Sequence, residues 1–317
     1  MKHALKSMLW SMVLLLAAPL RAQEPPQLDV AFLLDATGSM GDEIDAVKDK
    51  IQDMISTIAL GNPAPEVRFG IVAYRDRGDE YVTAVYELTS DIDAVIANLH
   101  QIKADGGGDY PESLNEALHA TVHELNWDQR DAASRLVFLI ADAPPHLDYP
   151  DDYDYVEEYQ MAAEKGIAIH AIGASGLDEE GERIYKEISA ATGGQFEWLA
   201  YESRYVDQDG EEVVVVVEGR TATYHKADST WTVEGPGAMP EGGPTRGGAA
   251  TMDSGAAVVA VAEADGGAST GAVETSTNLA DLITSALREA AEEQGVDYDG
   301  TTSVPRATWG QIKERAR

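Results

Sequence analysis

Short apolar runs alternate with amphipathic segments between residues 28 and 200, and this alternation limits the folds open to the chain. Several of the runs are continuous, as expected for strands buried on both faces. In the segments between them, apolar residues recur at intervals of three and four, which places them on one face of a helix. The expected strands are residues 30–34, 69–74, 82–88, 136–141, 167–172 and 195–199, and the expected helices are 44–58, 94–102, 114–125, 153–165 and 179–191. This order predicts an α/β fold with a doubly wound, mainly parallel six-stranded sheet and helices on both faces.

The composition changes near residue 200. Residues 201–234 are rich in Val, Thr and Tyr and contain an Asp-Gly turn signal, which predicts a β-hairpin insertion. Residues 235–276 are rich in Gly, Ala, Ser and Thr, which predicts a flexible low-complexity segment. An amphipathic helix follows and is expected to be the last helix of the α/β domain. That domain would then comprise residues 28–200 and 277–295, with a C-terminal tail at 296–317.

The first 22 residues have the pattern of an export signal. Lys2 and Lys6 supply a positive start, and residues 8–20 form an apolar stretch that is short for a membrane span. A signal peptide at 1–22, cleaved after Ala22, is therefore expected, with an uncleaved anchor as the alternative. No later segment is long and apolar enough to span a membrane, so no stable membrane insertion is expected after cleavage.

The chain contains no cysteine, so its stability cannot come from disulfides and bacterial-type lipid attachment is excluded. An exported protein of this kind fits a bacterial source, and either a periplasmic or a secreted location. The net charge of −33 repels nucleic acid and anionic membranes, so no nucleic-acid partner is expected. Adaptation to high salt is an equally good explanation of this acidity.

Oxygen-bearing side chains follow the first strand at regular spacing. Asp35, Thr37 and Ser39 come directly after the apolar run at 30–34. A carboxylate and two hydroxyls on one turn suit a hard divalent cation, which prefers oxygen ligands. The alternative is that Thr37 or Ser39 caps the following helix and that Asp35 accepts bonds from backbone amides.

The stretch DATGSM at 35–40 resembles the metal-ion-dependent adhesion site (MIDAS) of von Willebrand factor type A (VWA) domains, whose pattern is Asp-x-Ser/Thr-x-Ser. Two later motifs follow in the family's order: GGGDYPE, which contains Asp109, and DAPPH, which begins at Asp142. Together they resemble a bacterial exported branch of the family. The resemblance implies a Rossmann-like fold. It also implies a metal site formed by Asp35, Thr37, Ser39, Asp109 and Asp142. The implied cofactor is a divalent cation, Mg²⁺ first, with Mn²⁺ or Ca²⁺ as alternatives, and the implied partner is a protein or extracellular ligand at the metal face.

Asp109 departs from the family pattern, because many members have Thr at this position. With Asp35 and Asp142 it would bring three carboxylates to one ion, which predicts tighter metal retention and weaker engagement of a ligand carboxylate. Three alternatives stay open. Asp109 could bind through water, Ser113 could take its place, or Asp109 could cap the helix that begins near Pro111.

Catalysis has little support in the sequence, and the chain is not expected to be an enzyme. It has no cysteine nucleophile, no Gly-x-Ser-x-Gly elbow and no phosphate-binding loop. Two alternatives to metal-dependent binding remain. One is a metal-assisted hydrolase with His146 or Glu112 as the base, and the other is a structural metal with the β-rich insertion as the binding element.

Two further groups of polar residues are less informative. His119 and His123 have a helical spacing that can bind zinc, but no third ligand is evident, so a solvated helix flank is favoured. The acidic run at 148–159 lacks the spacing of an EF-hand and favours a solvated loop at the rim of the metal face.

Overall fold

The computed structural model of the chain describes residues 25–206, 210–234 and 274–298. The expected signal peptide, most of the expected flexible segment and most of the tail lie outside the described residues. Within the described part, no helix has the length and apolar character needed to cross a membrane.

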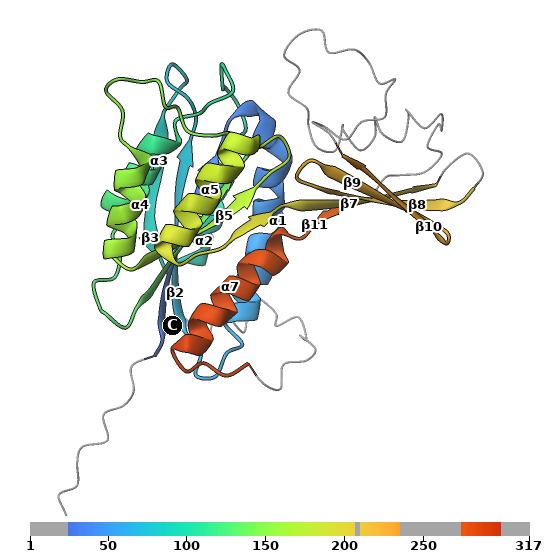
Figure 1. Cartoon of the computed structure of the whole chain (residues 1–317). Helices are drawn as coiled ribbons and strands as arrows, with labels where there is room; N and C mark the ends of the chain where they lie inside the picture. The colour runs from blue at the N-terminus through green and yellow to red at the C-terminus, as the bar shows by residue number, and fades with distance from the viewer. Residues whose placement is uncertain (1–24, 207–209, 235–273, 299–317) are drawn as a thin grey trace, which may run out of the picture.

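The larger sheet has six strands in the order β3-β2-β1-β4-β5-β6 (Figure 1). The strands are β1 (Gln27–Asp35), β2 (Glu66–Tyr74), β3 (Thr83–Thr89), β4 (Ser134–Ala141), β5 (Ile167–Gly173) and β6 (Phe196–Trp198). All neighbours pair in parallel except β3, which runs antiparallel to β2 at the edge. The predicted fold class is therefore confirmed.

Helices cover both faces of this sheet. They are α1 (Gly41–Ile58), α2 (Ile92–Leu99), α3 (Leu114–His123), α4 (Tyr155–Glu164), α5 (Glu179–Thr192) and α7 (Leu279–Glu293), with a short 3₁₀ turn, η1 (Gly38–Met40), before α1. Side chains alternate across the central strand β1: Phe32 faces the core under α1, α2 and α7, whereas Leu33 faces the core under α3, α4 and α5. All nine residues of β1 are buried, which agrees with the continuous apolar run at 30–34.

A second sheet of five antiparallel strands extends from one edge of the molecule, in the order β10-β9-β8-β7-β11 (Figure 1). Its strands are β7 (Ala200–Val206), β8 (Glu212–Glu218), β9 (Thr221–Lys226), β10 (Ser229–Glu234) and β11 (Glu274–Thr277). Strand β7 follows β6 almost directly, and β11 leads into α7, so the chain leaves and re-enters the α/β domain at neighbouring strands. Residues 274–276, expected in the flexible segment, form most of β11.

The carboxyl ends of the central strands share one edge of the larger sheet. Strand β1 ends at Asp35, and β4, its parallel neighbour, ends at Ala141, one residue before Asp142. In a sheet of this type, ligands bind outside the carboxyl ends of the strands. The fold therefore brings two of the predicted metal ligands to the same edge.

Candidate metal centre

Asp35 lies fully buried at the end of β1. One carboxylate oxygen, Oδ1, accepts hydrogen bonds from the backbone nitrogen of Thr37 at 2.9 Å and from its hydroxyl at 2.7 Å. The other oxygen, Oδ2, is buried without a hydrogen-bond partner. A buried carboxylate oxygen without a partner is costly unless a cation or proton satisfies it. One oxygen of Asp35 thus shapes the turn, and the other is free to bind.

The two hydroxyls of the motif lie beside this carboxylate. The Oγ1 atom of Thr37 is 3.4 Å from the Oγ atom of Ser39. Thr37 stands at the N-cap position of η1, but its side chain makes no capping bond. Its hydroxyl is used instead toward Asp35, which leaves oxygen lone pairs available to an ion.

Asp142 completes a buried pair of carboxyls. Its side chain is largely buried, and burial raises its pKa, whereas a hydrogen bond from Ser39 lowers it. Burial also raises the pKa of Asp35, and the charge of Asp142 raises it further. Two buried acids with raised pKa values, one of them raised further by the charge of the other, favour a site that binds positive charge.

Glu112 brings a third buried carboxyl close to the turn. Its Oε2 atom has no partner, and burial, followed by the charges of Asp35 and Asp76, raises its pKa to about 10. A Cβ atom on Gly107 would lie 2.8 Å from the Oε1 atom of Glu112 and 3.1 Å from the Cβ atom of Thr37. The Gly-rich loop therefore fits between Glu112 and Thr37, which requires a residue without a side chain.

Glu43, in the first turn of α1, is a fourth buried acid near the site. The Tyr201 hydroxyl of β7 donates a hydrogen bond to Oε1 of Glu43, while Oε2 has no partner. Burial raises the pKa of Glu43 to about 7, against the lowering effect of the Tyr201 bond, and the charge of Asp142 raises it further. The second sheet thus contacts the surroundings of the candidate site through Tyr201.

Asp109 occupies a different position from the other predicted ligands. Its side chain is 65% exposed, and its carboxylate lies 4.0 Å from the Nε2 atom of His146. The structure brings Asp35, Thr37, Ser39 and Asp142 together, and groups Asp109 with Asp76 and His146. A role for Asp109 as a metal ligand remains a prediction.

His146 and Ser113 tie the loops of this edge together. The imidazole is buried, with Nδ1 at 2.8 Å from Asp148 and Nε2 at 3.4 Å from Asp76. Ser113 is also buried and donates its hydroxyl hydrogen to the same Asp76 carboxylate at 3.0 Å. Asp76 therefore joins the DAPPH loop to the start of α3.

The residues of this edge fit a hard divalent cation. The buried oxygens without a hydrogen-bond partner in the described residues include one each on Asp35, Glu43 and Glu112. In the described parts of the chain, neither these acids nor Asp142 form an ion pair with lysine or arginine. Carboxyl and hydroxyl oxygens without a cationic partner are the donor set that Mg²⁺, Mn²⁺ and Ca²⁺ prefer.

The sequence indicates Glu112 only as a possible base, and it does not mark Glu43 as part of the candidate site. A signal for Glu43 existed, because it lies one helical turn before Val47 on the buried face of α1. The burial of Glu112 had no local signal, since it depends on contacts between two loops: its amide donates to the carbonyl of Pro144 at 3.0 Å.

Comparison with known proteins identifies the domain. The model of the von Willebrand factor type A domain matches residues 29–205. A putative ariadne-like RING finger protein of Acanthamoeba polyphaga mimivirus is 25% identical over 203 residues, which is 59% of this chain and 19% of that protein. The von Willebrand factor A domain-containing protein 7 of Homo sapiens is 38% identical over 121 residues, 38% of this chain and 12% of that protein. The chain thus spans less than a fifth of the length of these relatives.

Two solved structures are also similar. Proximal thread matrix protein 1 from the mussel byssus, solved with a zinc-occupied MIDAS motif, has a TM-score of 0.43 and 17% identity, over 55% of this chain and 42% of that chain. The conserved hypothetical protein BatB from Bacteroides thetaiotaomicron has a TM-score of 0.39 and 17% identity, over 55% of this chain and 89% of that chain.

Proposed function

Because the chain belongs to the von Willebrand factor type A family, as its motifs indicated, we propose that it binds a divalent cation at the carboxyl ends of β1 and β4 and uses that face to bind a protein or other extracellular ligand. The observation that carries this proposal is the buried Asp35 oxygen without a partner, beside the carboxyl of Asp142. Thr37 and Ser39 would supply hydroxyl ligands, and Asp109 would complete the set from the Gly-rich loop.

Mg²⁺ is the proposed ion, with Mn²⁺ and Ca²⁺ as competitors, since every candidate ligand is an oxygen. When bound, the ion supplies positive charge to the buried acids and an open position for a carboxylate of the partner. The acid-rich surroundings strengthen the hold on the ion and weaken its attraction for that carboxylate.

We propose binding rather than catalysis for this face. The Nδ1 atom of His146 is 2.8 Å from Asp148, and its Nε2 atom is 3.1 Å from the Tyr149 hydroxyl, so both ring nitrogens are engaged. These contacts weaken His146 as a candidate for the base of a metal-assisted hydrolase.

Residues 1–22 are proposed to direct export in a bacterial cell, to the periplasm or beyond it. The support is the positively charged start and the short apolar stretch of this segment. Mass determination of the protein recovered outside the cytoplasm tests the proposal: a mature protein that begins at Gln23 is expected, and recovery of the intact chain in the cytoplasm would contradict it.

Calorimetric titration of Mg²⁺, Mn²⁺ and Ca²⁺ into the metal-free protein tests the metal site. One saturable site is expected, and Asp142→Asn should abolish it while the fold is retained. Asp45→Asn is the matched control, because Asp45 is an exposed acid on α1 whose side chain is 74% exposed. Equal binding by the wild type and Asp142→Asn would refute the proposed site.

A second candidate places partner binding on the second sheet and gives the metal a structural role. It is favoured by the exposed Trp231 on β10, whose side chain stacks on Tyr224 with ring centroids 5.1 Å apart. Exposed aromatic side chains are frequent anchors in protein interfaces. Loss of partner capture in Trp231→Ser with unchanged Mg²⁺ affinity would favour this candidate over the metal face.

A further inference from the structure

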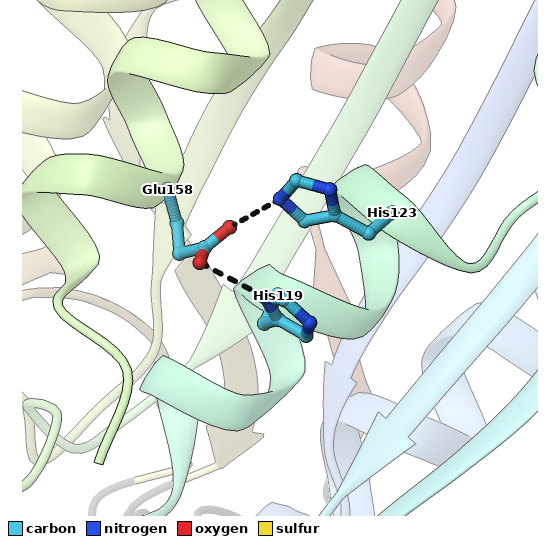
Figure 2. Close-up of side chains that lie close together, drawn as sticks. All are labelled: His119, His123 and Glu158. Atoms are coloured by element: carbon cyan, nitrogen blue, oxygen red, sulfur yellow. Dashed lines mark hydrogen bonds and ion pairs between the residues drawn. The ribbon is translucent and has the colours of Figure 1, made fainter.

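Two histidines and a glutamate converge on the outer surface of α3 and α4, away from the carboxyl ends of β1 and β4. His119 and His123 are one helical turn apart on α3, so their rings project from the same side of the helix. Glu158 on α4 points between them (Figure 2). The third ligand that the sequence lacks beside the histidine pair is therefore supplied by the neighbouring helix.

The donor atoms are close enough to share one ion. One oxygen of Glu158 lies 2.9 Å from the Nδ1 atom of His119, and the other lies 3.0 Å from the Nε2 atom of His123 (Figure 2). One donor atom from each of the three residues lies within 4.8 Å of the others. Tetrahedral zinc holds its ligands about 2.0–2.2 Å away, which corresponds to donor separations of about 3.3–3.6 Å. The two histidine–glutamate separations are therefore within about 0.7 Å of the zinc-bound geometry.

The side chains are also held in place before any ion binds. The rings of His119 and His123 stack with centroids 4.5 Å apart, and the ring of Tyr153 stacks on His119 with centroids 3.7 Å apart. Glu158 is 8% exposed, whereas the two histidines are 27% and 31% exposed. A buried carboxylate bonded to two partly exposed imidazoles is a preorganised group of donors that an ion can reach from solvent.

We propose that His119, His123 and Glu158 form a second metal site, which takes Zn²⁺ or a neighbouring transition metal and is independent of the proposed Mg²⁺ site. Imidazole nitrogen favours Zn²⁺, Cu²⁺, Ni²⁺ and Co²⁺ over Mg²⁺ and Ca²⁺, whereas the MIDAS-type site offers only oxygen. Three protein ligands leave one position of a tetrahedral ion open to water or to a donor from a partner. The ion would also link α3 to α4.

Lys165 limits the affinity of this site. Its ammonium lies 3.4 Å from the Nδ1 atom of His123 and donates a hydrogen bond to the carbonyl of Val122 at 2.8 Å. When Nε2 of His123 binds a metal, Nδ1 carries the proton and can no longer accept from Lys165. The lysine then keeps only its bond to Val122, and its charge repels the ion. Lys165→Met should therefore tighten zinc binding.

The competing explanation is a hydrogen-bonded trio without a metal, in which both imidazoles donate to Glu158. Glutamine separates the two explanations, because its amide can donate to Glu158 but is a poor zinc ligand. The double variant His119→Gln/His123→Gln should therefore retain the fold and lose the metal. His100→Gln is the matched control, since His100 is an exposed histidine at the end of α2.

The experiment measures zinc uptake by equilibrium dialysis with metal analysis, and Co²⁺ binding by visible absorption, on the full chain stripped of metal. Asp142→Asn serves as the background in which zinc cannot use the oxygen site. In that background the protein is expected to bind one Zn²⁺. Either single glutamine substitution should reduce the zinc affinity by about tenfold to a hundredfold or more, whereas His100→Gln should leave it unchanged. Circular dichroism and thermal melting verify that each variant is folded.

Two results would overturn this proposal. One is equal zinc affinity in Asp142→Asn with and without the two glutamines, and the other is no zinc uptake by Asp142→Asn at all. Mg²⁺ titration of the double glutamine variant is expected to match the wild type. Failure of the Mg²⁺ site would leave this test intact, because the Zn²⁺ and Mg²⁺ measurements depend on different residues.

Discussion

Glu43 makes a sharp prediction about how the metal-free protein responds to pH. The residue is 3% exposed in the first turn of α1, and burial is the main reason why its pKa rises from an ordinary 4.5 to about 7. The folded protein therefore keeps a proton on Glu43 over a pH range in which the unfolded chain has released it. The proton stabilises the fold fully below pH 4.5, and this contribution is lost as the pH rises through about 7.

The size of the effect follows from the same two pKa values. At 1.36 kcal/mol per pH unit, a rise from 4.5 to about 7 corresponds to about 3 kcal/mol of stability lost between these limits. Glu43→Gln removes the titration but leaves an oxygen to accept the Tyr201 hydrogen bond. Relative to the wild type, the variant should therefore gain up to about 3 kcal/mol in unfolding free energy as the pH rises from 4.5 to 8.

Urea unfolding at half-unit pH intervals, in the presence of a chelator, measures this difference. Glu157→Gln is the matched control, because Glu157 also lies in the first turn of a helix but is exposed. A constant difference between Glu43→Gln and the wild type from pH 4.5 to 8 would refute the reasoning. Saturating Mg²⁺ should flatten the wild-type slope, since a nearby cation favours ionised Glu43.

Three substitutions test the packing that supports the site. Gly107→Ala places a Cβ atom 2.8 Å from Oε1 of Glu112 at a φ of +74°, so we expect a loss of about 1–3 kcal/mol in urea unfolding and weaker Mg²⁺ binding by calorimetry. Gly194→Ala brings a Cβ atom to 2.1 Å from a backbone carbonyl oxygen of β5, so the same unfolding assay should show a loss of about 3 kcal/mol. Arg68→Ala removes the two hydrogen bonds that the guanidinium donates to the fully buried Asp29, at 2.8 and 2.5 Å, and leaves that carboxylate without its cation, so it should cost about 3–5 kcal/mol by thermal or urea unfolding. Stabilities within about 0.5 kcal/mol of the wild type would contradict each expectation.

The sequence predicts the larger sheet well, because each of its strands carries its own apolar signal. The run at 30–34 lies inside β1, and the edge run at 82–88 overlaps the antiparallel β3. For the second sheet, the sequence predicts only a β-hairpin insertion. Its fifth strand, β11, contains the polar sequence ETST, and it is a strand because β7 pairs with it across a long stretch of chain. Pairing of this kind leaves no local pattern.

The candidate sites divide along the same line. Asp35, Thr37 and Ser39 are recognisable together because they share one turn. Glu158 has no such neighbour in sequence: it lies in an acidic run, and only the packing of α4 against α3 brings it to His119 and His123. Local spacing identifies half of a metal site, whereas the ligand that completes it comes from another element.

The contact between Tyr201 and Glu43 links the cation site to the second sheet. Tyr201 is buried at the start of β7, and β7 pairs with β11, which leads into α7. A cation beside Asp142 favours the ionised form of Glu43, and an ionised carboxylate accepts the tyrosine hydrogen bond more strongly than a protonated one does. Metal occupancy therefore stabilises the point at which the second sheet joins the α/β domain. We therefore expect the insertion and the proposed metal face to be coupled through the Tyr201–Glu43 hydrogen bond, even if only one of them contacts the partner.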